Sequence, residues 1–253
     1  MGFSEQLALA NRLQVAHNEL TIGVAGDVAR IFPMLDVNNL DQSFGAYSRN
    51  LIGLTQIRRA VAGNLGAAYF MATRLDNGID DDFVPDTSPP VPNEALFNSL
   101  LATGPILMKK GLGSGRTAEE VRAIAITATT GALQRHVLNG SRDTVKRLVY
   151  RDTRCNGWAR VSAGSRVCWF CSMLVSRGAV YKDQRTASRT VSGDPYHDHC
   201  HCYAVAVFNN GRYPGDERAA DMQDLWYAST EGTSGPAMRT KFRQAYDSTY
   251  KPN

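Results

Sequence analysis

The first 150 residues of this 253-residue chain carry their apolar side chains mainly at helical spacing. In residues 3–32, leucine, valine and alanine return every three or four positions with polar residues between them, and Pro33 ends the run. Residues 47–75 repeat this pattern. Apolar residues at this spacing line one face of a helix. We therefore predict two long amphipathic scaffold helices in this half of the chain.

The helical pattern stops in residues 76–92, DNGIDDDFVPDTSPPVP, which we call the acidic loop. Its five aspartates and four prolines leave little apolar surface to bury and prevent a helix. We predict an irregular loop or linker. Helical signals resume at Glu94.

A capping box marks the start of the next long helix. The hydroxyl of Thr117 and the carboxylate of Glu120 can each accept a hydrogen bond from an otherwise unpaired backbone N–H of the first turn. We expect this helix to end near Leu138, because Asn139-Gly140 is a typical stop signal. Ser141 would then cap a separate helix.

Basic residues crowd the segment that follows. Residues 135–189 hold twelve lysines and arginines against three aspartates, although the whole chain has a net charge of only +4. Such a local excess attracts polyanions, since salt screens the rest of the molecule beyond about 8 Å. We expect a basic helix face that meets double-stranded DNA without sequence preference, or an acidic protein partner. A solvated surface is the alternative. The residues expected on this face are Arg142, Lys146, Arg147 and Arg151.

Beyond Gly157 the pattern changes to short β-prone segments and then returns to helix. We predict strands over residues 158–162, 179–181 and 203–208, and helices over residues 219–227 and 238–250.

Two tight groups of cysteine and histidine lie within this β-prone part. They are the sequences CWFC, from Cys168 to Cys171, and HDHCHC, from His197 to Cys202. Sulfur and imidazole donors favour zinc over the oxygen-seeking calcium and magnesium. We predict a closed, structural zinc site held by Cys168, Cys171, His197 and Cys200, with Cys202 as an alternate ligand. His199 and His201 should point away from the two cysteines if this segment is a strand.

Two other interpretations of these cysteines stay open. They could be buried free thiols beside surface histidines, or CWFC could be a redox pair of the thioredoxin kind, although no suitable strand precedes it. Cys155 stands apart and is expected to be a small buried apolar residue.

The composition fits a globular protein of one large or two modest domains. Hydrophobic residues make up 43% of the chain and charged residues 21%. No apolar stretch is long enough for a membrane span, the start lacks a signal-peptide pattern, and the odd cysteine count favours a reducing compartment. We predict a predominantly helical α+β fold. A helical region over residues 1–150 would precede a zinc-stabilised α+β module with a helical tail over residues 151–253.

Residues 160–181, RVSAGSRVCWFCSMLVSRGAVY, and residues 196–202, YHDHCHC, resemble the Mu F-like head morphogenesis proteins of phages, especially minor capsid proteins of actinobacterial phages. In that family a CxxC, a short helix, a glycine and a strand residue precede an HxxCxC group. The match covers about 50 residues, and the helical parts agree only in general character. Asp198-His199 stands where the family often has Pro-Asn. The resemblance therefore identifies the histidine ligand less specifically than the cysteine ligands.

The resemblance implies a non-enzymatic virion protein, made in the host cytoplasm and carried into the head near the portal. Portal or major capsid protein would be its partner, and packaged double-stranded DNA a further one. No membrane contact is implied. The resemblance also places the metal ligands on Cys168, Cys171, His197 and Cys200, with Cys202 on the last cysteine of the motif.

Two enzymatic alternatives remain. Some relatives are described as capsid maturation proteases, but Gly113-Ser114-Gly115 is not a nucleophile elbow, and His17 and His136 lie in helical stretches. An HNH-type nuclease would use the histidine-rich segment from Asp194, but such domains usually have further ligands, and no cysteine or histidine follows Cys202.

Overall fold

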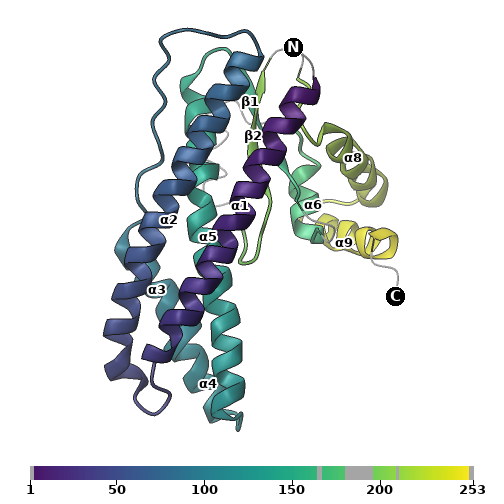
Figure 1. Cartoon of the computed structure of the whole chain (residues 1–253). Helices are drawn as coiled ribbons and strands as arrows, with labels where there is room; N and C mark the ends of the chain where they lie inside the picture. Colours follow the sequence, from purple (N-terminus) through teal and green to yellow (C-terminus); the bar gives the residue numbers. More distant parts are fainter. Residues whose placement is uncertain (1–2, 164–166, 180–195, 209–210, 251–253) are drawn as a thin grey trace.

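The computed structural model describes residues 3–163, 167–179, 196–208 and 211–250. Three long helices run side by side along the molecule (Figure 1). They are α1 (Phe3–Ile31), α2 (Leu40–Asp76) and α5 (Ala118–Arg151). α2 and α5 make the most extensive contact, and α1 packs against both. The two helices expected over residues 3–32 and 47–75 are confirmed, and the second begins earlier than predicted.

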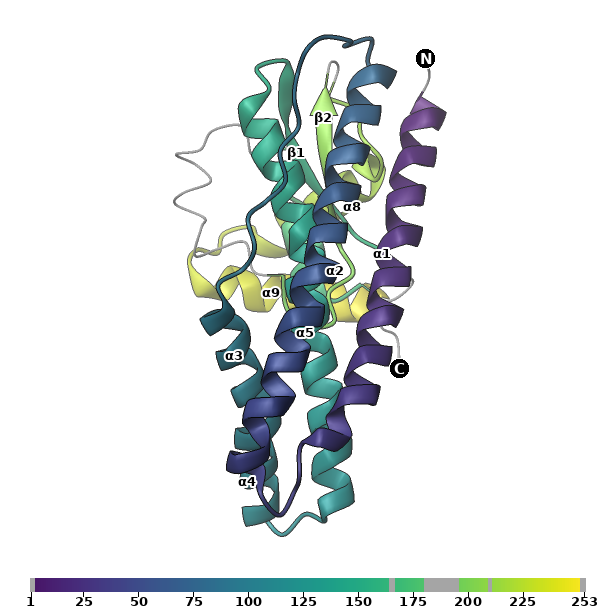
Figure 2. The ribbon, with the colours of Figure 1, turned by 60° about the vertical axis from the view of Figure 1, so that its left-hand side comes forward.

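One end of this bundle has its own core. A single 3-10 turn, η1 (Phe32–Met34), leads out of α1. Helix α3 (Asn93–Leu101), the π-helical turn η2 (Ala102–Ile106) and α4 (Leu107–Gly113) pack against α5, and α3 and η2 also contact α2 (Figure 2). The core contains fully buried side chains from α1, α2, α3, α4 and α5, and from the residue that follows η1. They include Val28, Leu35, Tyr47, Leu51, Leu96, Leu100, Met108 and Val137.

The other end of the bundle supports a two-stranded antiparallel sheet. Strands β1 (Cys155–Val161) and β2 (Tyr203–Phe208) pair with Trp158 opposite Ala206. Every residue of β2 is buried, and β2 contacts α5. The predicted strand over residues 203–208 is therefore confirmed. The strand predicted over residues 158–162 is also present, but it begins at Cys155 and ends at Val161. Of the expected strand 179–181, Ala179 lies in a bend and the rest falls outside the described residues.

Three shorter helices of the described part of the chain lie at this end. α6 (Trp169–Val175) packs on α8 (Asp216–Thr230) and α9 (Pro236–Tyr250), close to the sheet (Figure 1). The predominantly helical α+β class is thus confirmed. One core joins the helices and the sheet across the division expected at residue 150, because Leu13, Phe70 and Val145 share it with Val205 and Phe242. No helix in the described ranges has the length and apolar character needed to cross a membrane.

The capping box at Thr117 is present, with Glu120 N–H bonded to Thr117 Oγ1 at 3.2 Å. The predicted break at Asn139-Gly140 is wrong, because α5 continues without interruption to Arg151. Gly140 instead permits close helix packing: a Cβ atom there would lie 2.3 Å from the backbone oxygen of Arg59 in α2. Tertiary packing therefore outweighs the local stop signal.

The acidic loop has no helix or strand after residue 78, as expected, but it is not a free linker. It runs along α2 and α5, and polar groups hold it there. Arg147 and Arg151 of α5 both pair with Asp86, and the Ser88 N–H donates to Thr144 Oγ1 at 2.8 Å. The ring of Phe83 packs against Phe70 at 5.7 Å between centroids.

We expect Gly140→Ala to destabilise the fold by about 1–3 kcal/mol, because the added methyl group must push the two helices apart. Gly26→Ala is the matched control, since Gly26 lies inside α1 with nothing within 4 Å of the added Cβ. That control should gain about 0.5–1 kcal/mol from its lower backbone entropy in the unfolded chain. Urea denaturation measures both variants. Equal stability of the two would contradict the close helix contact.

Candidate metal centre

The CWFC group forms the start of α6. Cys168 is the N-cap residue, and its Sγ accepts a hydrogen bond from the Cys171 N–H at 3.3 Å. An N-cap residue and the residue three positions later face the same side of the first turn. Both sulfurs therefore point to one place, as the sequence spacing predicted.

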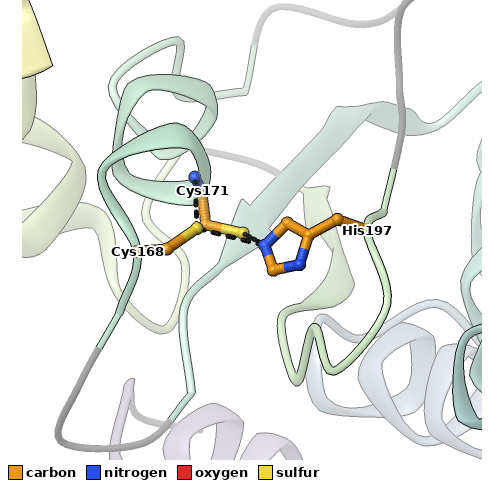
Figure 3. A group of neighbouring side chains, drawn as sticks. All are labelled: Cys168, Cys171 and His197. Atoms are coloured by element: carbon orange, nitrogen blue, oxygen red, sulfur yellow. Dashed lines mark hydrogen bonds between the residues drawn. The ribbon is translucent and has the colours of Figure 1, made fainter. Parts of the chain in front are cut away.

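His197 reaches these sulfurs from the other side (Figure 3). It belongs to residues 196–202, which we call the ligand loop and which lead directly into β2. The His197 Nε2 atom lies 3.0 Å from Cys168 Sγ and 3.2 Å from Cys171 Sγ. Its other ring nitrogen, Nδ1, lies 2.7 Å from the carbonyl oxygen of Asp198, which fixes the orientation of the ring.

The ligand loop adds two more sulfurs. Cys200 Sγ lies 3.5 Å from Cys171 Sγ, and the donor atoms of Cys171, Cys200 and Cys202 all lie within 4.8 Å of one another. Cys171 thus belongs to two groups of donors, one with Cys168 and His197 and one with the two loop cysteines. All five predicted ligands are brought together, and the side chains could hold a metal ion.

The chemistry of the donors fits a soft cation. None of the five cysteines forms a disulfide, and Cys171, Cys200 and Cys202 are buried. A tetrahedral ion with bonds of about 2.0–2.3 Å to nitrogen and sulfur needs donors about 3–4 Å apart. The short distances around Cys171 are of this order.

Hydrogen bonds within the cluster perturb its acids and bases. Interaction with the Cys171 side chain lowers the pKa of Cys168 to about 4 and also lowers the pKa of Cys200. The hydrogen bond to the Cys168 sulfur raises the pKa of His197 to about 9. A metal ion would displace the shared protons, because the metal binds thiolate sulfur and neutral imidazole.

The basic residues of α5 occupy different environments from those predicted. Arg142 was expected at a DNA-binding surface, but its side chain is completely buried beneath the ligand loop. It donates to the carbonyl oxygens of Cys200 and Cys202 at 2.6 and 2.9 Å. The expectation for Arg142 is therefore wrong, because its charge faces the interior.

The other three basic residues lie nearer the surface. Lys146 is half-buried, with its Nζ 4.7 Å from the centre of the Trp158 ring. Arg147 and Arg151 are exposed, but both pair with Asp86 of the acidic loop. A large part of the predicted positive face is thus neutralised within the protein.

The remaining histidines and cysteines fall into clear roles. His201 is exposed beside buried Cys200 and Cys202, in agreement with the predicted alternation. His199 does not follow a strand geometry: it lies in a turn with a φ of 61° and contacts α5 at Gly131. Cys155 is buried in the sheet core, as expected, with its Sγ 3.3 Å from the Val207 carbonyl oxygen.

The candidate protease residues are not assembled into a site. The Ser114 hydroxyl donates to the Gly111 carbonyl oxygen at 2.8 Å, within the last turn of α4. His136 is buried and its Nε2 lies 2.8 Å from the hydroxyl of Ser99. His17 is also buried, and neither of its ring nitrogens has a hydrogen-bond partner among the described residues. Burial lowers its pKa to about 3.

Comparison with known families gives a clear result for most of the chain. The VG15 protein family matches residues 5–229, a range that contains the long helices, the sheet and all five metal-site donors. The chain belongs to the VG15 protein family. The match covers the helical region and the module together, so the family architecture includes both.

A relative from a phage supports this assignment. The chain is 26% identical over 108 residues to the gene 15 protein of Mycobacterium phage L5, which covers 30% of this chain and 37% of that protein. The chain thus spans well under half of that relative in the match. No solved structure is similar. The expectation of a phage protein family is confirmed, and the more specific Mu F-like assignment stays a prediction.

We expect the purified protein to bind about one metal ion per chain, and Cys171→Ser to abolish most of this binding, because Cys171 belongs to both donor groups. Cys155→Ser is the matched control: it is also a buried cysteine, and serine can keep its hydrogen bond to a carbonyl oxygen. Elemental analysis after gel filtration measures the metal content. Equal content in the two variants would exclude this cluster as the metal site.

Proposed function

We propose that the protein is a non-enzymatic minor capsid or head morphogenesis component of a phage virion. The observation that carries the proposal is the family match over residues 5–229, together with similarity to a phage gene product. The cysteine and histidine cluster, which resembles that of Mu F-like proteins, adds support. Portal protein or major capsid protein is the proposed partner, with a location at the portal or the inner capsid surface.

We further propose that the metal ion is zinc and that its role is structural. Sulfur-rich, tetrahedral donor sets are typical of structural zinc sites, and a complete shell leaves no position for a reacting water molecule. The ion would join α6 to the ligand loop and hence to β2. This link would stabilise a two-stranded sheet, which is marginal without further support.

Protein contact is favoured over DNA contact as the main interaction. Of the four basic residues first assigned to DNA, Arg142 is buried, and Arg147 and Arg151 pair with Asp86. Phosphate would have to replace these internal pairs, which reduces the gain from binding. Contact with packaged DNA remains a secondary proposal that rests on Lys146, Arg147 and Arg151.

The environment of His136 supports a non-enzymatic role. A serine beside a histidine is part of a serine protease site, and the Ser99–His136 pair has this form. Burial, with a contribution from Arg135 and Arg59, lowers the pKa of His136 to about 4. Such an imidazole is a weak general base at neutral pH. For the nuclease alternative, Asp194 falls outside the described residues.

We expect the protein to be present in purified heads of the phage that encodes it, at a few copies per particle, and its deletion to reduce the yield of infectious, DNA-filled heads. Quantitative mass spectrometry of gradient-purified particles gives the copy number, and electron microscopy of the deletion lysate gives the head defect. Complementation with the parent or Cys155→Ser should restore filled heads, whereas Cys171→Ser should not. Normal, infectious particles without the protein would refute the proposed function.

A further inference from the structure

Arg142 has an unusual environment for an arginine. Its side chain is completely buried, and its three hydrogen bonds go to uncharged oxygens: the carbonyls of Cys200 and Cys202 and the side-chain oxygen of Asn139 at 2.9 Å. Its guanidinium carbon also lies 3.8 Å from the centre of the Tyr196 ring. Among the described residues, no carboxylate pairs with it. A buried charge without an opposite charge is strongly unfavourable.

The metal centre would provide the missing negative charge. Three thiolates and a neutral imidazole around a divalent cation give a net charge of −1, and four thiolates give −2. Cys200 and Cys202 are the residues whose carbonyl oxygens Arg142 binds. The guanidinium therefore lies directly behind the backbone that carries these two cysteines. There its positive charge would offset the negative charge of the thiolates.

The contacts of Arg142 also cover both ends of the ligand loop. Tyr196 immediately precedes His197, and Cys200 and Cys202 end the loop. Two further contacts hold the middle of the loop to α5: Arg135 Nε lies 2.7 Å from Asp198 Oδ1, and the His199 ring fills the space above Gly131. Helix α5 thus contacts the ligand loop along its whole length. Among the α5 residues that make these contacts, Arg142 is the one whose charged side chain is fully buried.

We propose that Arg142 is a positioning residue of the metal centre. Its guanidinium holds Cys200 and Cys202 in place for the metal ion and offsets the negative charge of their sulfurs. This inference rests on the metal binding proposed above. It assigns to Arg142 a role inside the protein, in place of the DNA contact that the sequence had indicated.

The test compares metal affinity in three variants of the full chain, with cobalt(II) as the probe. We expect Arg142→Met to weaken cobalt binding by about 10–100-fold, the usual effect of losing a group that orients metal ligands. Arg142→Lys keeps the charge but not the paired hydrogen bonds, so it should recover part of the affinity. Arg122→Met replaces an exposed arginine on the same helix, so this variant should bind cobalt as the parent does. Competition with a chelator, followed through the sulfur-to-cobalt absorption band, gives the dissociation constants.

A purely structural arginine would give a different result. Arg142→Met would then lower the unfolding midpoint of the metal-free and cobalt-loaded forms by the same amount, and the cobalt affinity would not change. That outcome would overturn the inference, and so would a loss of cobalt affinity in Arg122→Met as large as the loss in Arg142→Met. If Arg142→Met does not fold, Arg142→Lys decides: parent-like affinity and absorption spectrum would also overturn it. A parent protein that binds no cobalt would instead refute the metal site itself.

Discussion

The close contact between α2 and α5 is the constraint on which the rest of the structure depends. At Gly140, α5 approaches the backbone of α2 so closely that no side chain fits, and at Gly66 of α2 a Cβ atom would lie 2.7 Å from the carbonyl oxygen of Ser141. The two glycines lie in different helices, so each removes bulk where the partner helix comes nearest. This contact keeps α5 continuous through a segment whose local sequence favours a break.

A continuous α5 presents different faces to three neighbours. One face packs on α2, another carries the acidic loop through Arg147 and Thr144, and a third supports β2 and the ligand loop through Arg142. If α5 ended at Leu138 and restarted at Ser141, these faces would no longer keep a fixed rotation relative to one another. The geometry of the candidate metal centre therefore depends on a helix contact that includes none of the five donor residues.

Charge balance explains why Arg147, Arg151 and Arg154, in the described part of the basic stretch, do not form an unopposed positive surface. Arg74 is buried against Asp81 and Asp152, Arg154 also pairs with Asp81, and Arg147 pairs with Asp86. The acidic loop thus supplies the counter-charges for the arginines that follow it much later in the chain. The net charge of a sequence segment predicts the charge of a surface only if the counter-charges lie elsewhere in the fold. Here the acidic loop places the counter-charges next to the arginines.

Features that depend on a few neighbouring residues could be predicted from the sequence. The long amphipathic helices, the capping box at Thr117 and the strand at residues 203–208 belong to this class, as does the gathering of the cysteines, because donor chemistry is visible in CxxC and HxxCxC alone. The continuation of α5 through Gly140 and the burial of Arg142 could not be predicted. Both depend on partners distant in sequence: the backbone of Arg59 in one case and the carbonyl oxygens of the ligand loop in the other.

The same distinction applies to the packing of the module on the bundle. Its sheet shares one hydrophobic core with Leu13, Phe70 and Val145 of the long helices, and its ligand loop rests on α5. Metal binding free energy would therefore act on the joint between the module and the bundle, as well as within the module. In a particle that assembles around a partner, such coupling would fix the orientation of the two parts. A rigid orientation lowers the entropy lost when both parts contact a partner at once, which is the physical advantage of joining them through one helix.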